Sequence, residues 1–258
     1  RTSMQFRILL GAGALPSLVV LWAAATEPEV ARPVKRSGGQ LSHSLAEPRH
    51  WRTLLGTAGT WLLFDVAFYG NVIFMPVILR HVFGRGQSLG DLAWHAAFMS
   101  FLGIVGTMGG VLAVNRLGPK TLNTVGLTVG ALFFVAFAVA CRLQASPTVR
   151  FALLCSINFV LYGSANIATF LLPVVSFPRD VRSTFHGLSS AAAKVGAMAG
   201  ALLFPLIDHH FGAQAVMSTQ AGVCLAGALV CHLFVESRGL RDVDETSQSS
   251  VELTKWHA

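Results

Sequence analysis

An aspartate lies in the middle of a long apolar stretch of this sequence. Asp65 interrupts residues 53–79 and sits about twelve residues, or roughly 18 Å of helix, from either end. If the stretch crosses a membrane, an ionised carboxylate at its centre costs at least about 2.5–3.5 kcal/mol, so it should face a cavity and have a partner or a proton. We interpret Asp65 as a functional residue. The alternative is a protonated aspartate that makes a hydrogen bond between helices.

Two polar aromatic residues share a helical face with this aspartate. Trp61, Asp65 and Tyr69 are spaced i, i+4 and i+8, so on a helix they fall within an arc of roughly 80°. An indole N–H, a carboxyl and a phenol in one stripe form a polar wall suited to an oxygen-rich solute. Alone, a Trp or Tyr at such spacing is more often a core or interfacial residue. The central carboxyl favours the functional interpretation.

Further polar residues interrupt two other apolar stretches. Lys194 is central in residues 183–207, so it either locks helices together through a buried ion pair or compensates charge in a proton or substrate path. Asn166, within residues 151–178, could equally make an interhelical hydrogen bond. In that stretch Pro173 would free backbone carbonyls, which suits a helix that bends during gating.

An enzyme is not expected from this sequence. It has no nucleophile–base pairing, no glycine-rich phosphate loop and no paired carboxylates, and we expect no cofactor. The histidines are scattered near span ends and loops, and the cysteines show no metal-type spacing, so we predict no metal site. The nine histidines include His95, His186, His209, His210 and His232, and the four cysteines are Cys141, Cys155, Cys224 and Cys231.

The elements that position these residues are predicted by where charges are missing. Only 12% of residues are charged, 53% are hydrophobic and the mean hydropathy is +0.60. Seven stretches of 19 to 28 residues carry at most one charge each: 8–26, 53–79, 92–115, 121–141, 151–178, 183–207 and 209–235. Each is long enough for a helix to cross about 30 Å of hydrocarbon. The alternating polarity of a membrane β-barrel is absent. We therefore predict an all-α membrane protein with seven transmembrane helices.

The basic residues predict the orientation. One set of connecting segments carries twelve Lys and Arg, and the segments on the opposite side carry six. This bias places residues 27–52 and the C-terminal tail in the cytoplasm. The net charge of +7 and the pI of about 9.8 thus reflect topology, and we expect no nucleic-acid partner.

The spacing of the stretches predicts four parts. We expect residues 1–26 to be the last helix of an N-terminal bundle, 27–52 a cytoplasmic linker, 53–236 a six-helix bundle and 237–258 a cytoplasmic tail. The other connections are short, which favours antiparallel neighbours. The chain opens directly into a span, so we expect it to begin at an interior point of a longer protein. Helix count alone does not separate this arrangement from a seven-helix receptor, but the long loop argues against one.

Several motifs resemble one transporter family. LLGTAGTWLLFDVAFYGNVIF (54–74) closely matches the seventh helix of the phosphate:proton symporters of the major facilitator superfamily, the phosphate permeases of fungi and plants. NIATFLLPVVSFPRDVRSTFHGLSSAAAKVGA (166–197) is similar to that family's tenth and eleventh helices. RILLGAGALPSLVVLW and TEPEVAR (7–32), VNRLGPK (114–120) and FVESRGL (234–240) resemble the end of its N-terminal half, its loop between helices eight and nine, and its closing motif.

The resemblance implies a fold and a site. The chain would hold helices six to twelve of a twelve-helix transporter, and helices one to five would be missing partners. Substrate-binding residues would be Trp61, Asp65, Tyr69 and Asn166, and the proton-coupling residues would be Asp65 and Lys194. The chain departs from the family pattern at Asn115, Pro119, Val175 and Val235.

The expected function is secondary active symport of inorganic phosphate and protons by alternating access, in a multi-pass protein of the plasma membrane. Two alternatives stay open. One is a facilitator for another solute, such as a sugar or an organic anion. The other is a truncated membrane protein that does not transport.

Overall fold

The computed structural model describes residues 2–26, 47–84 and 86–237. Every regular element in these ranges is a helix. The chain divides into two compact units, residues 1–40 and 41–258. The first contains helix α1 (Thr2–Thr26), and the second contains all the other helices.

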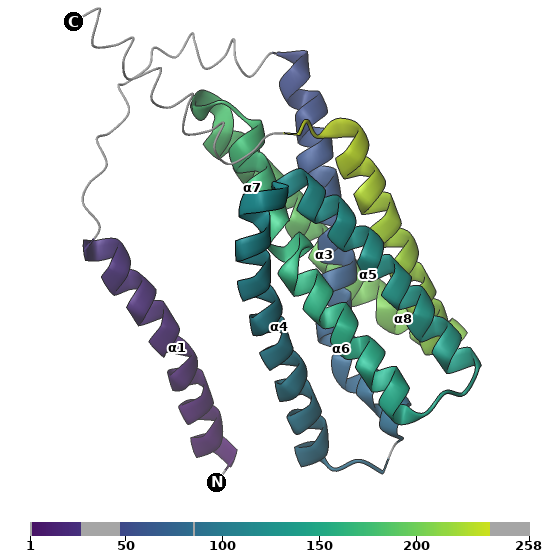
Figure 1. Ribbon diagram of the computed structural model, residues 1–258. Helices are drawn as coiled ribbons and strands as arrows, with labels where there is room; N and C mark the ends of the chain where they lie inside the picture. The colour runs from purple at the N-terminus through teal and green to yellow at the C-terminus, as the bar shows by residue number, and fades with distance from the viewer. Residues whose placement is uncertain (1, 27–46, 85, 238–258) are drawn as a thin grey trace, which may run out of the picture. The chain divides into compact units, whose positions relative to one another are not determined.

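The second unit is a bundle of long helices joined by short turns (Figure 1). In chain order they are α3 (Pro48–Phe83), α4 (Leu89–Leu117), α5 (Pro119–Arg142), α6 (Pro147–Gly163), α7 (Ala165–Ser176) and α8 (Arg179–Phe234). Helices α3, α5 and α6 each begin with a proline, whose missing N–H costs nothing in a first helical turn. Helix α4 begins with a reciprocal capping box between Ser88 and Asp91.

Helix α8 is two antiparallel legs. Gly212 within it has φ 80° and ψ 168°, a left-handed φ that glycine adopts without strain. Before this turn, a Cβ at Gly196 would collide with the carbonyl oxygen of Leu62. After it, the carbonyl of Gly227 accepts a hydrogen bond from Thr60 at 3.0 Å. Since Thr60 and Leu62 are neighbours on α3, α8 must fold back so that both legs pack on the same part of that helix.

The predicted membrane fold is confirmed. Five helices in the described residues are long and apolar enough to span a bilayer, and a shorter apolar helix covers Gly11–Thr26. One of the five, Val181–Phe234, contains both legs of α8, so the helices are consistent with the predicted number of seven. That number stays a prediction.

Two predicted boundaries can be compared with the helices. Helix α3 begins at Pro48, inside the segment expected to be linker, and the chain turns at Gly212, inside the stretch 209–235 that was expected to be one span. The rest of the expected linker, 27–46, and nearly all of the expected tail, 238–258, lie outside the described residues.

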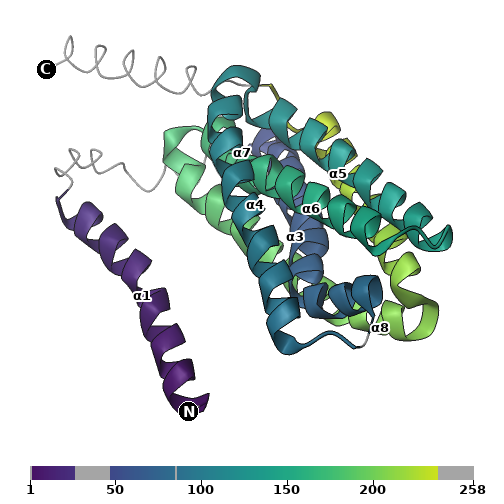
Figure 2. The same cartoon turned by 60° about the horizontal axis from the view of Figure 1, so that its bottom comes forward.

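Helix α3 packs most extensively against α8, while α4 lies against α6 and α5 against α8 (Figures 1 and 2). Glycines permit the closest approaches. A Cβ at Gly200 would collide with the carbonyl of Val66, and one at Gly110 with that of Gly163. Such contacts replace the hydrophobic effect as a packing force where the surroundings are lipid. The contacts of Gly196 and Gly200 fix the register of α3 against α8, which carry most of the predicted site.

Candidate functional site

The centre of the site is an ion pair between two helices of the bundle. The Lys194 Nζ on α8 lies 3.7 Å from Asp65 Oδ2 on α3. The Asp65 side chain is 3% exposed and that of Lys194 is 62% exposed. Within the described residues Asp65 Oδ2 accepts no hydrogen bond, and the separation exceeds the roughly 2.7–2.9 Å of a tight charge-assisted bond. The lysine is therefore a close but loosely held counter-charge.

Tyr69 lies beside this pair. Its ring centroid is 5.1 Å from Lys194 Nζ, within the distance at which a ring face attracts a cation. The lysine thus bridges a carboxylate and an aromatic face on the same stripe of α3. Asp65, Tyr69 and Lys194 therefore lie together, and their roles in binding and coupling stay predictions.

Trp61 is buried at the other end of the stripe, with 2% exposed. Its side chain and that of Lys194 are polar neighbours of the Asp65 carboxyl. Its ring packs on Phe170 of α7 at 4.7 Å between centroids and meets His186 of α8 edge-on at 5.6 Å. Elements α3, α7 and α8 therefore converge on Trp61.

Asn166 stands near the same wall. It is partly exposed and lies one helical turn before Phe170 on α7, so the two share a face. Because Phe170 packs on Trp61, this face of α7 is turned toward α3. A role for Asn166 in binding stays a prediction.

The apolar stretch that carries Asn166 is interrupted between α6 and α7. Pro173 lies inside α7, and bending there during gating stays a prediction; the interruption falls at Ser164, with φ −130° and ψ −87°. The Ser164 hydroxyl donates to the Val160 carbonyl. Gly163 packs its backbone against Gly106 of α4. Tertiary packing on α4 thus places the break two residues before Asn166.

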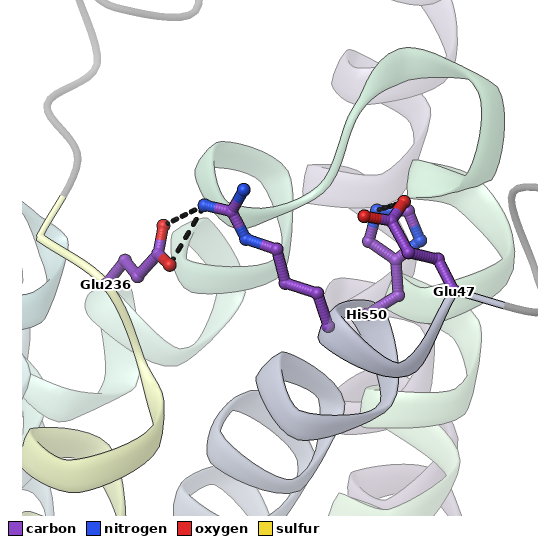
Figure 3. A network of polar contacts seen from close by, with 4 residues as sticks. Glu47, His50 and Glu236 are labelled. Carbon is purple, nitrogen blue, oxygen red and sulfur yellow. Dashed lines mark hydrogen bonds and ion pairs between the residues drawn. The ribbon is translucent and has the colours of Figure 1, made fainter.

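The bundle end predicted to be cytoplasmic carries a polar network (Figure 3). Arg49 at the start of α3 donates to both carboxylate oxygens of Glu236 just after α8, at 2.9 and 2.7 Å. Next to it, His50 Nε2 lies 3.6 Å from a carboxylate oxygen of Glu47. A cavity of about 240 Å³ is lined by these four residues with Thr53, Ser176 and Pro178. The network joins the first and last helical turns of the six-helix unit.

Two parts of this arrangement were not expected. His186 was assigned to a span end, but it packs on Trp61. Its spacing, two turns before Lys194 on one helix, is the signal that could have found it. Asp208 Oδ2 pairs with His81 Nε2 at 3.6 Å at the opposite end of α3, and nothing in the sequence pattern indicated that contact.

The long apolar helices define a polytopic membrane protein, and a buried carboxylate with an exposed lysine beside it lies within its bundle. Residues 47–248 match the family model described as "Sugar (and other) transporter". The chain belongs to this family of the major facilitator superfamily.

The relatives carry more specific names. The chain is 35% identical over 90% of its length to "Inorganic phosphate transporter PT2" of Toxoplasma gondii, and spans 41% of that protein. It is 29% identical over 79% of its length to "Inorganic phosphate transporter 1-2" of Oryza sativa subsp. japonica, and spans 44% of it. The predicted resemblance to phosphate transporters is confirmed. The chain covers about two fifths of the length of these curated relatives.

Proposed function

We propose that this chain forms one wall of an inorganic phosphate:proton symporter that works by alternating access. The observation that carries the proposal is the buried Asp65 with the exposed Lys194 as its counter-charge. The names of the relatives support phosphate as the solute. The remaining wall would come from helices one to five of the complete transporter, since such sites lie between two halves.

The ion pair suggests how proton and phosphate are coupled. Without substrate, Lys194 balances the charge of Asp65. An arriving phosphate attracts the same ammonium group, because Lys194 is open on the side away from Asp65. A buried carboxylate that loses its partner is strongly destabilised, and two adjacent anions repel at low dielectric. Asp65 therefore takes up a proton as phosphate binds.

The neighbours of the pair supply hydrogen-bond donors. In this proposal the Trp61 indole, the Tyr69 hydroxyl and the Asn166 amide donate to phosphate oxygens near the membrane midplane. Rocking of the two halves then exposes the site to alternate sides. The plasma membrane and the orientation with residues 27–52 in the cytoplasm are part of this proposal.

The test is Asp65→Asn in the full-length protein that contains this chain. The variant keeps the side-chain volume but cannot carry a proton between states, so we expect it to lose uphill phosphate uptake driven by a pH gradient. The matched control is Asp91→Asn, the same change at an exposed position of α4, which should retain uptake. Undiminished accumulation by Asp65→Asn would overturn the coupling role.

The alternative solutes are tested in the same assay. A sugar or organic-anion facilitator should accumulate the labelled sugar or organic anion, and unlabelled phosphate should not compete with that uptake. A non-transporting protein would accumulate none of them. Replacing the pH gradient by a sodium gradient distinguishes the two coupling cations, since Asp65 could serve either.

A further inference from the structure

A second polar stripe runs along α8 opposite the stripe on α3. His186, Ser190 and Lys194 are spaced i, i+4 and i+8, so they share one side of the first leg of α8. His186 and Ser190 are partly exposed and Lys194 is exposed. The packing face of this leg, with Gly196 and Gly200 against α3, points elsewhere around the helix. The stripe therefore borders an open side of the bundle.

The two stripes meet at both of their ends. Lys194 contacts Asp65 and Tyr69, and His186 contacts Trp61. His186 lies eight residues before Lys194, or roughly 12 Å along the helix, toward the end of the bundle that carries Arg49 and Glu236. The polar surface thus continues past the predicted phosphate site in one direction.

We propose that His186 is a further substrate-contacting residue, on the path between the Asp65 level and the cytoplasmic mouth. Its imidazole N–H donates to a phosphate oxygen as the anion passes Trp61. This inference rests on the proposed function, and it adds a residue that neither the sequence motifs nor the relatives' names assign.

The surroundings of His186 favour an anion contact. Its ring neighbours are Trp61 and Phe170, which offer no carboxylate to compete for the imidazole. Along α8 the nearest charged residue before His186 is Arg182, one turn away, and the nearest after it is Lys194, two turns away; both are basic, while the acidic Asp180 comes six residues before His186. Across the packed helix the only carboxylate of the α3 stripe is Asp65, which Lys194 balances. A phosphate would meet donors and positive charge along this side.

The experiment compares three variants in phosphate uptake by the full-length protein. His186→Phe keeps an aromatic ring against Trp61 but removes the N–H, and His186→Gln keeps a donor but removes the ring. We expect His186→Phe to raise the KM for phosphate about tenfold, the cost of one lost charge-assisted hydrogen bond, and His186→Gln to stay within about threefold of the parent. His186→Leu should behave like His186→Phe and gives a second reading if one variant reaches the membrane poorly.

The outcomes separate this inference from the proposed function. If the parent transports phosphate and His186→Phe keeps its KM while His186→Gln loses uptake, His186 only packs on Trp61 and the inference is wrong. If both keep the parental KM, the inference is also wrong. If the parent itself takes up no phosphate, the proposed function fails first.

Discussion

At the scale of single residues, the site depends on the unequal burial of two opposite charges. Asp65 is enclosed by the bundle, whereas most of the Lys194 side chain is open. A lysine so placed can leave its partner for a substrate, while the carboxylate cannot follow it. The pair is better suited to exchange of partners than to locking α3 against α8.

Removing the Lys194 charge should destabilise the protein, because the buried Asp65 carboxylate loses its counter-charge. Lys194→Gln leaves Asp65 buried without a counter-charge, and we expect it to lower stability by about 2 kcal/mol. This is less than the roughly 3–5 kcal/mol of a fully buried pair, because Lys194 is solvent-screened. The deficit should shrink as pH falls, since protonation neutralises the unpaired carboxyl. Thermal unfolding of purified protein at several pH values measures both effects.

A double variant provides the control. Asp65→Asn combined with Lys194→Gln removes both charges, so most of the lost stability should return although uptake stays absent. Equal stability of Lys194→Gln and the parent at neutral pH would show that the pair contributes nothing.

Residues that lie on one face of a single helix could be grouped from the sequence alone. Trp61, Asp65 and Tyr69 share one helix, so their common face follows from 3.6 residues per turn. The partner of Lys194 could not be named in this way, because Asp65 is distant in sequence and their contact depends on how α8 packs. His186 was missed for the same reason, since its neighbours Trp61 and Phe170 come from two other helices.

At the scale of elements, glycines hold the charge pair in register. The site requires α8 to lie close against α3, and Gly196 and Gly200 allow direct contact with the α3 backbone at Leu62 and Val66. Lys194 is two residues before Gly196. Any separation of the helices at this point therefore also separates Lys194 from Asp65.

A methyl group at this contact should be enough to disturb it. Gly196→Ala would place a Cβ against the Leu62 carbonyl, and we expect a loss of about 1–3 kcal/mol, as for overpacked cores. The matched control is Gly222→Ala, also in α8, where a Cβ meets nothing within 4 Å. Thermal unfolding of both variants measures the difference. Equal effects at the two positions would contradict the close approach.

The existence of the apolar helices could be predicted from the sequence, whereas the residues at which helices are interrupted could not. Span lengths follow from bilayer thickness, which acts on every apolar stretch alike. The helices are interrupted at Ser164 and at Gly212. Several glycines, serines and prolines in these stretches could have interrupted a helix, and contacts between helices decide which of them does. Pro173 stayed within its helix, since a missing N–H can be tolerated where neighbouring groups satisfy the freed carbonyl.

At the scale of the whole six-helix unit, the polar network at the end of the bundle joins α3 to the end of α8. The Arg49 and Glu236 side chains are 57% and 55% exposed. Exposed ion pairs contribute little because water screens them and ordering two long side chains costs entropy. Closure of the bundle must therefore come mainly from the packing of α3 with both legs of α8.

Arg49→Ala should accordingly change the free energy of unfolding by less than about 1 kcal/mol. A double-mutant cycle with Glu236→Ala isolates the pair from other contacts of either residue, and we expect a coupling energy of about 0.5 kcal/mol. A coupling energy well above 1 kcal/mol would mean that this pair, rather than helix packing, holds the end closed.

The distance in sequence between Asp65 and Lys194 has a consequence for synthesis. At about 5–20 residues per second, the ribosome adds the lysine on the order of ten seconds after the aspartate. During that interval α3 has neither leg of α8 beside it. The nascent protein must therefore keep this carboxyl neutral, or sheltered by other proteins at the insertion site, until its last two spans arrive. Because α8 is synthesised after the other helices of the six-helix unit, α3 spends the longest time in the membrane without the helix it packs against most extensively.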